Sequence, residues 1–491
     1  MSRIVRSLCV LALIPALGHA SGQPPSEPDV NLFFQAAAID EKQARLALEA
    51  IATGWRDGYA AMLVDLARLL PAARDRAPLS LRPDDGGPDR PDSPFAGLPE
   101  PPAPLDPRTE ARQRVVRFLE KQTGERFGDD LNRWRQWIWS LPYEPHPDYA
   151  RFKGALYGAI DPRMRLFFPA GAQSRIRLDQ VDWGGVIVNG IPPLDHPRTA
   201  PSREASYLKD SNIVFGLELN GDARAYPRRI IAWHELVRDR LGGIEITLVY
   251  CTLCGTVIPY SSEVGGVVRR FGTSGLLYRS NKLMFDEETN SLWSTFEGKP
   301  VIGALAGSGL VLPTHPLVTT SWGEWRAEHP STSVLTLDTG FKRDYSEGAA
   351  YRDYFSTDRL MFQVFGRDDR LGNKDEVLVL EPGPSSTSRP LAIAVRFLES
   401  HPIYHTQLSG RDLVIVTSAG GANRVYDSGS IRFVRRVSDG SIVDANGIPW
   451  RVNESELVST ELPPRILPRV PAHRAFWFGW RAQHPDTELI R

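Results

Sequence analysis

The segment of residues 242–260 decides the fold and reads Gly242-Gly243-Ile244-Glu245-Ile246-Thr247-Leu248-Val249-Tyr250-Cys251-Thr252-Leu253-Cys254-Gly255-Thr256-Val257-Ile258-Pro259-Tyr260. A glycine pair precedes a β-branched run, which stops at a Cys-x-x-Cys-Gly motif and continues as a second apolar run. β-Branched and aromatic residues favour strands, and glycine favours the turns between them. The sequence therefore predicts a strand, a cysteine turn and a second strand, with the other segments arranged around this unit.

The composition is ordinary for a globular protein, with 42% hydrophobic and 24% charged residues. A chain of 491 residues is expected to form two or three domains. The formal net charge of -1 gives no electrostatic reason to expect a nucleic acid or an anionic membrane as partner. With 41 Gly and 40 Pro, the chain is expected to be loop-rich and α+β, with a helical N-terminal region and a larger β-rich domain.

The N-terminus has the pattern of a signal peptide. Arg3 and Arg6 precede a short apolar run, and Gly18-His19-Ala20 is a small-x-small cleavage site. Residues 1–20 are expected to be removed near Ala20, which leaves Cys251 and Cys254 as the only cysteines. No later segment is apolar over the length that a transmembrane helix needs. We expect the mature protein to be periplasmic or secreted.

Residues 25–150 are expected to form a helical region that resembles HEAT repeats. Apolar residues recur at helical spacing on both sides of a break at Gly54, and again before Thr123-Gly124 and after Asp130. Residues 71–108 are dense in Pro, Asp, Gly and Arg, which predicts a flexible linker. A helical array of this kind can bind a protein partner, whose identity the sequence does not give.

From about residue 176 the sequence changes to short strands and glycine turns. Ile213–Leu219 and Ala223–Tyr226 are predicted to form a hairpin closed by Asn220-Gly221. Pro227 suits the first turn of a helix. The apolar residues that follow it predict that this helix continues to Leu241, where the Gly242-Gly243 pair ends it.

The second part of the chain contains an internal repeat. Trp325-Arg326-Ala327-Glu328-His329-Pro330-Ser331-Thr332 recurs 155 positions later as Trp480-Arg481-Ala482-Gln483-His484-Pro485-Asp486-Thr487. Residues 243–250 likewise resemble residues 410–417, but Ser418-Ala419-Gly420-Gly421 replaces the cysteine motif. The repeat predicts two similar units, residues 176–345 with the cysteines and residues 346–491 without them. Because His329 and His484 occur in both, we interpret them as packing residues.

The cysteine pair is compatible with more than one kind of chemistry. A thioredoxin-type site needs a helix directly after the pair, whereas residues 255–260 are predicted to be a strand. Cys-x-x-Cys-Gly between two strands is typical of a metal-binding knuckle, in which backbone N–H groups surround the thiolates. The sequence has no second cysteine pair, which excludes a four-cysteine site within one chain.

Further metal ligands would have to be His, Met, Asp or Glu. His234 lies in the helix predicted before the cysteine strand, and Glu235 and Met284 are additional candidates. Two thiolates with imidazole suit zinc, and thiolate, thioether and imidazole together suit copper(I). No phosphate loop is present, so no nucleotide cofactor is expected. No catalytic residue is assigned.

The motif Tyr250-Cys251-Thr252-Leu253-Cys254-Gly255 occurs together with several other ordered motifs, namely Arg224-Ala225-Tyr226-Pro227, Trp233-His234-Glu235, Gly275-Leu276-Leu277-Tyr278, Ser291-Leu292-Trp293 and Trp-x-x-Trp-x-x-x-His-Pro-x-Thr. In these motifs the chain from about residue 176 to its end resembles the exported domain-of-unknown-function family 3179. The resemblance implies that Cys251, Cys254 and His234-Glu235 lie in signature blocks of that family. It implies no reaction.

Three functional hypotheses follow. The first is an exported metal-binding protein in which Cys251, Cys254 and His234 hold copper or zinc. The second is a thiol–disulfide protein that uses Cys251 and Cys254 as a redox couple. The third is a non-catalytic interaction protein whose cysteines form an inert disulfide. The sequence does not decide whether the protein is an enzyme.

Overall fold

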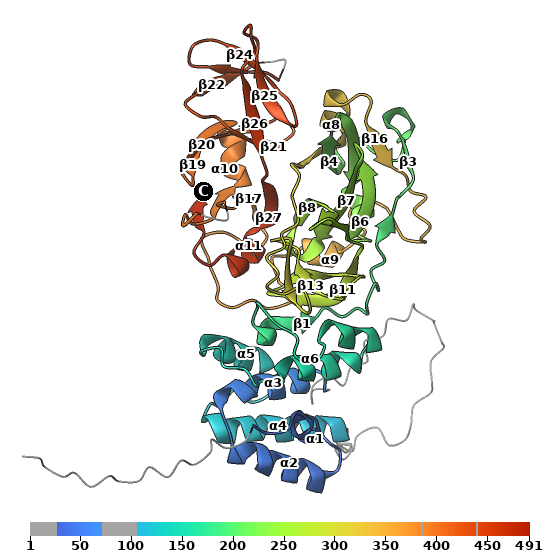
Figure 1. Ribbon diagram of the computed structural model, residues 1–491, viewed down its shortest axis with the longest axis vertical. Coiled ribbons are helices and arrows are strands. Elements are labelled where there is room, and N and C mark those ends of the chain that lie inside the picture. Colours follow the sequence, from blue (N-terminus) through green and yellow to red (C-terminus); the bar gives the residue numbers. More distant parts are fainter. Residues whose placement is uncertain (1–26, 71–105, 384–385, 438–439) are drawn as a thin grey trace, which may run out of the picture.

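The structure is a computed structural model that describes residues 27–70, 106–383, 386–437 and 440–491. The predicted signal peptide, residues 1–20, and residues 71–105 of the predicted linker lie outside the described residues. The predicted α+β class is confirmed, because helices form one end of the molecule and two β-rich units stand side by side beyond them (Figure 1).

The N-terminal region is helical, as predicted. Its helices are α1 (Val30–Gln35), α2 (Glu41–Thr53), η1 (Asp57–Tyr59), α3 (Ala60–Arg68), α4 (Pro107–Thr123), α5 (Leu131–Ser140), α6 (Tyr149–Gly158) and η2 (Pro162–Phe167). Asp106 caps α4 with Pro107 in its first turn, and Gly124 ends it with a φ of +80°. Asp130 caps α5 in the same way. The likeness to HEAT repeats stays a prediction.

The helices share an apolar core with the first sheet. After η3 (Leu178–Gln180), this sheet has the order β1 (Val181–Trp183), β11 (Phe271–Tyr278), β12 (Asn281–Asp286), β13 (Leu292–Ser294), β14 (Lys299–Ile302). Asp182 of β1 accepts from Arg68 of α3 and from Arg135 of α5, each at 2.5 Å. Because breaking a buried ion pair leaves an unpaired charge, these contacts fix the helices to the sheet.

The unit with the cysteines contains two further sheets. One has the order β15 (Val318–Ser321), β4 (Ile213–Leu219), β5 (Asp222–Pro227), β16 (Ser333–Leu335), β3 (Thr199–Pro201), and the other β2 (Leu194–Asp195), β6 (Leu236–Leu241), β7 (Ile244–Cys251), β8 (Thr256–Ser261). The elements that connect or flank them are η4 (Ser202–Glu204), α7 (Arg228–Ile231), η5 (Thr252–Cys254), β9 (Glu263–Val264), β10 (Val267–Val268), α8 (Trp322–Glu328) and α9 (Arg352–Phe355). The predicted hairpin is confirmed, since Asn220 and Gly221 turn between β4 and β5 with positive φ.

The helix predicted from Pro227 to Leu241 is wrong. Only the four residues of α7 are helical, and β6 follows, paired with β7. Gly242, with a φ of +55°, and Gly243, with a φ of +83°, form the turn of this hairpin instead of ending a helix. Strand pairing satisfies the backbone of residues 236–241, so tertiary contacts outweigh the local helical spacing of their apolar side chains.

The unit without cysteines repeats much of this arrangement. Its first sheet has the order β27 (His473–Phe476), β17 (Glu376–Leu380), β18 (Leu391–Ala394), β28 (Glu488–Ile490), and α10 (Val395–Ser400) and α11 (Trp477–Gln483) lie beside it. Its second sheet has the order β19 (Ile403–Leu408), β20 (Arg411–Thr417), β21 (Asn423–Asp427), β26 (Ile466–Val470), β25 (Glu456–Ser459), β24 (Pro449–Val452), β23 (Ile442–Asp444), β22 (Phe433–Arg436). In the unit with the cysteines, β5 is antiparallel to β4 and parallel to β16. In the unit without them, β18 is likewise antiparallel to β17 and parallel to β28. The sequence repeat therefore corresponds to a repeated chain path.

The repeated Trp-Arg-Ala element forms α8 in one unit and α11 in the other. The indole N–H of Trp325 donates to Oγ1 of Thr332 at 2.9 Å, and that of Trp480 donates to Oγ1 of Thr487 at 2.9 Å. The histidine that follows each helix packs on its tryptophan, with ring centroids 3.9 Å apart in both units. Both histidines are thus packing residues, as predicted.

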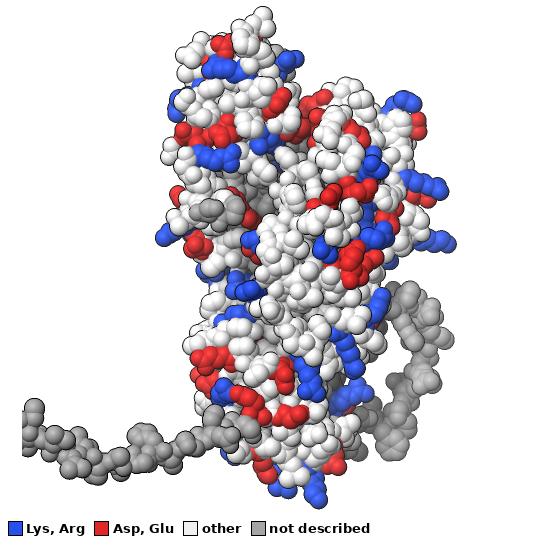
Figure 2. Space-filling view, in the orientation of Figure 1, with Lys and Arg blue, Asp and Glu red and all other residues white. Residues whose placement is uncertain are grey.

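The charged side chains are interspersed over the surface. Figure 2 shows basic and acidic groups mixed on the face in view, in agreement with the formal net charge of -1. Within the described residues, no helix has both the length and the apolar character needed to cross a membrane.

The two Trp–Thr hydrogen bonds are expected to stabilise the units independently. Thr332→Val or Thr487→Val leaves a buried indole N–H unpaired, which should lower the free energy of unfolding by about 1–3 kcal/mol in each case. Urea denaturation measures this loss, with Thr199→Val on the exposed surface of β3 as the control. A loss no larger than that of the control would contradict the assigned role of these bonds.

Candidate functional site

The two cysteines lie in a tight turn between paired strands. β7 ends at Cys251, η5 includes Cys254, and β8 starts at Thr256. Gly255 closes the turn with a φ of +62°, a conformation that favours glycine. Both cysteines are buried, 3% and 0% exposed, and both are free thiols. The predicted order of strand, turn and strand is confirmed.

The turn between β11 and β12 presents polar groups to the two sulfurs. Ser280 has a φ of +64°, which keeps this hairpin tight. The backbone N–H of Lys282 donates to the sulfur of Cys251, and the side-chain amide of Asn281 donates to Sγ of Cys254 at 3.5 Å. The Cys254 thiol lies between two acceptors, the carbonyl oxygen of Ser280 at 3.3 Å and the Cys251 sulfur. Each sulfur therefore has fixed polar partners in apolar surroundings.

The two thiols differ in their tendency to ionise. Burial and the Glu235 carboxylate oppose the thiolate of Cys251, but hydrogen bonds from Cys254 and from the Lys282 N–H, together with the Lys282 ammonium, outweigh them. The pKa of Cys251 therefore lies below its ordinary value. Burial and the interaction with Cys251 hold the pKa of Cys254 well above its ordinary value. Because the thiolate is the reactive form of cysteine, Cys251 is the better nucleophile of the pair.

Glu235 connects the cysteine turn to the lysine. It is 6% exposed and has a φ of +57°, which is uncommon for a residue other than glycine. Its Oε1 accepts from Oγ1 of Thr252 at 2.6 Å and from the hydroxyl of Tyr351 at 2.8 Å. The Lys282 ammonium donates to the Glu235 carbonyl at 2.8 Å and lies 3.5 Å from Oε2. Burial lowers the pKa of Lys282, and the negative charges of Glu235 and Cys251 counteract this effect.

The unit without cysteines supplies part of the wall around the turn. A Cβ added at Gly479 of α11 would lie 3.2 Å from Sγ of Cys254. A Cβ added at Gly255 would lie 2.9 Å from the ring of Phe476 in β27. The surroundings of the thiols are therefore complete only when the two units are packed against each other.

The remaining predicted ligands have different surroundings. Nδ1 of His234 lies 2.9 Å from the carbonyl oxygen of Pro192, and Nε2 lies 2.6 Å from the hydroxyl of Tyr345. Met284 is fully buried and belongs to the same apolar cluster as both cysteines. The structure thus brings Glu235 to the cysteine turn and Met284 into the surrounding core, whereas the His234 ring is engaged with other partners.

Sequence reasoning missed Lys282, Asn281, Tyr351 and Gly479. The one available signal was Lys282 itself, which lies near the start of a short strand whose next three residues are apolar and which is buried along its whole length. Tyr351 and Gly479 reach the turn from distant parts of the chain, and no local pattern marks them. These residues become visible only in the folded chain.

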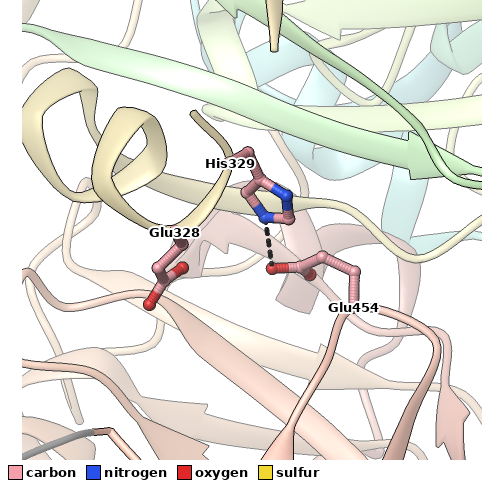
Figure 3. Close-up of side chains that lie close together, drawn as sticks. All are labelled: Glu328, His329 and Glu454. Atoms are coloured by element: carbon pink, nitrogen blue, oxygen red, sulfur yellow. Dashed lines mark ion pairs between the residues drawn. The ribbon is translucent and has the colours of Figure 1, made fainter. Parts of the chain in front are cut away.

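A second group of potential ligands lies between the two units. In the part of the chain that is described, Glu328, His329 and Glu454 form the single group of three or more His, Cys, Asp or Glu ligand atoms within 4.8 Å of one another. Figure 3 shows the ring of His329 facing the Glu454 carboxylate, at 3.6 Å. The buried guanidinium of Arg424 lies 2.6 Å from Glu328 and 2.5 Å from Glu454. Because Arg424 supplies the positive charge between the two carboxylates, we interpret this group as an ion-pair network that joins the units.

The fold and the site together define an α+β protein of two repeated units, one of which holds a buried pair of free thiols. The chain belongs to the family described as protein of unknown function (DUF3179), whose model matches residues 188–487. The resemblance seen in the sequence is therefore confirmed. Comparison with curated proteins and with solved structures gave no match.

Two substitutions beside Cys251 should move its pKa in opposite directions. Lys282→Met removes the ammonium but keeps the backbone N–H, so the pKa of Cys251 should rise. Glu235→Gln removes a negative charge and keeps an acceptor for Thr252, so this pKa should fall. The pH dependence of alkylation by iodoacetamide, followed by mass spectrometry in a Cys254→Ser background, measures both shifts.

Arg203→Gln is the matched control, because this exposed side chain lies outside the site. Shifts of Cys251 in the same direction for Lys282→Met and Glu235→Gln would contradict the electrostatic account and would indicate a general disturbance of the turn.

Proposed function

We propose that Cys251 and Cys254 form a redox-active dithiol that exchanges with a disulfide substrate. The observation that carries this proposal is the geometry of two adjacent free thiols with different partners, since Cys254 faces the Ser280 carbonyl oxygen and Cys251 accepts from Cys254 and from the Lys282 N–H, in accord with a lowered pKa of Cys251 and a raised pKa of Cys254. Thiol–disulfide exchange needs an attacking thiolate and, to complete the reaction, a second thiol within reach of the first. The cysteine turn offers both.

In the proposed reaction the Cys251 thiolate attacks one sulfur of the substrate disulfide. The substrate S–S bond breaks, and the leaving thiolate takes up a proton. Cys254 then loses its proton and attacks the Cys251 sulfur, which forms the Cys251–Cys254 disulfide and releases the second substrate thiol. Two electrons pass from the protein to the substrate, and an external dithiol returns the protein to its reduced form by the reverse steps.

Lys282 and Glu235 act as positioning residues in this proposal. The Lys282 ammonium favours the thiolate of Cys251, and Glu235 holds both the lysine and Thr252, which lies between the cysteines. Because these groups are buried, salt screens their interaction with the thiolate only weakly. The thiolate is therefore expected to persist at physiological ionic strength.

Binding of copper or zinc by Cys251 and Cys254 is the second candidate function. The N–H donors around the sulfurs support it, since the thiolates of metal knuckles receive such bonds. His234 would have to give up two hydrogen bonds to become a ligand. Among the described residues, the cysteine sulfurs take part in no group of three His, Cys, Asp or Glu ligand atoms that all lie within 4.8 Å of one another. We therefore favour the dithiol proposal.

We also infer that the protein acts outside the cytosol. The signal-peptide pattern that ends at Ala20 supports export to the periplasm or the medium. Disulfides form and persist in these compartments, whereas cytosolic thiols are kept reduced. The inferred location would supply the proposed dithiol with its substrates.

A redox titration tests the dithiol proposal against the metal proposal. The protein is purified without oxygen, equilibrated with mixtures of reduced and oxidised dithiothreitol, and quenched with a maleimide that labels free thiols. In protein that lacks residues 1–20, and with them Cys9, we expect one two-electron transition, in which molecules carry either two labels or none. Cys251→Ser and Cys254→Ser should each abolish this transition.

Metal analysis of the same preparation provides the alternative outcome. Two labels at every redox ratio would overturn the dithiol proposal. One equivalent of copper or zinc that is lost in both serine variants would support the metal proposal in its place.

A further inference from the structure

A pocket of about 350 Å³ lies beside the cysteine turn. Tyr250, which precedes Cys251, and Gly255, which follows Cys254, both line it. Phe476 and other residues of the unit without cysteines form part of its wall. The pocket therefore lies between the two units and touches both ends of the turn that carries the thiols.

Positive charge dominates the lining of this pocket. Five basic and two acidic side chains line it, which gives an excess of three positive charges: Arg228, Arg229, Arg352, Lys374 and Arg474 against Glu347 and Glu376. The chain as a whole has a formal net charge of -1, so this excess is a local feature. Such a concentration of like charge favours an anionic ligand.

The two acidic side chains of the lining pair with three of its cations, since Glu376 lies 2.9 Å from Arg474 and Glu347 lies 3.6 Å from Arg228 and 3.8 Å from Arg229. Neutral groups also contact Arg229 and Lys374. Arg229 donates to the carbonyl oxygens of Tyr345 at 2.5 Å and Tyr207 at 2.7 Å. Lys374 donates to the carbonyl oxygens of Tyr354 and Thr357. A carbonyl oxygen orients a cation without cancelling its charge. The pocket thus offers positive charge that is fixed in position before a ligand arrives.

Part of the pocket wall is aromatic. The rings of Phe215 and Tyr250 lie 5.1 Å apart, and those of Phe355 and Phe476 lie 6.3 Å apart. All four side chains line the pocket. Its volume lies at the lower end of the range of small-molecule sites, which combine apolar walls with a few polar groups. The lining therefore suits a small molecule with an apolar body and an anionic group.

We propose that this pocket binds a small organic anion with an aromatic or apolar body, and that the disulfide reduced by Cys251 and Cys254 is an acidic molecule of this kind. The second part of the proposal rests on the dithiol function proposed above. The binding site itself rests only on the charge, the walls and the position of the pocket. Thiol–disulfide exchange at the cysteine turn would then begin with a substrate held by its anionic group.

Two aromatic disulfides of different charge test this proposal. 5,5′-Dithiobis(2-nitrobenzoate) carries two carboxylates, and 4,4′-dithiodipyridine is neutral at pH 7; each releases a thiol that can be followed by its absorbance. Arg352→Gln, which removes an exposed guanidinium, should slow the reaction with the anionic reagent about fivefold and leave the neutral reagent unaffected. Added salt should likewise slow only the anionic reagent. Arg203→Gln is the control, because this exposed side chain does not line the pocket.

A separate measurement keeps the two proposals distinguishable. Equilibrium dialysis of 2-nitrobenzoate with a Cys251→Ser/Cys254→Ser double variant tests the anion site in a protein without thiols. We expect saturable binding that Arg352→Gln weakens.

The two measurements together distinguish failure of the anion site from failure of the dithiol function. Reaction with both disulfides, with no effect of Arg352→Gln and no binding of 2-nitrobenzoate, would overturn the anion site and leave the dithiol intact. Binding of 2-nitrobenzoate without reaction of either disulfide would uphold the anion site and overturn the dithiol function, together with the proposed substrate class.

Discussion

The buried carboxylate of Glu235 is the group on which the site depends. Removing a carboxylate from water is costly unless hydrogen bonds and opposite charge compensate for it. Here Thr252, Tyr351 and Lys282 provide that compensation. The same contacts tie the cysteine turn to the β11–β12 hairpin and keep the Lys282 ammonium close to Cys251. Glu235 and Lys282 thus act on the pKa of Cys251 in opposite directions, in addition to burial and the hydrogen bond from Cys254.

The repeat explains why a site of this kind can lie in the interior. Two units share a chain path and a Trp–Thr hydrogen bond, but only the first carries thiols. In the second unit the corresponding turn contains Ser418, whose Oγ accepts from the backbone N–H of Ala422, a structural contact. That unit instead contributes Gly479 and Phe476 to the surroundings of the first. The first unit thus contains the thiols, and the second unit covers them.

The sequence was sufficient to predict what local patterns determine. Alternating and β-branched residues around Cys251 and Cys254 predicted the strands and the turn, and Asn220-Gly221 predicted a hairpin. The helix expected over residues 227–241 was wrong because Gly242-Gly243 closes a hairpin, a pairing that the spacing of apolar residues does not reveal. The placement of His234 also depended on that helix. Lys282 and Tyr351 could not be assigned, since their contacts with Glu235 join residues far apart in the chain.

The central claim is that Cys251 is the attacking thiol and Cys254 the resolving one, and it is tested most directly by trapping the mixed disulfide. Cys254→Ser and Cys251→Ser variants are each incubated at neutral pH with a small disulfide, and the adduct is located by mass spectrometry of proteolytic peptides. The account predicts rapid formation of an adduct at Cys251 in the first variant and little adduct in the second, because burial and the Glu235 carboxylate still oppose the thiolate of Cys254 when Cys251 is replaced. Equal or faster adduct formation at Cys254 would contradict it.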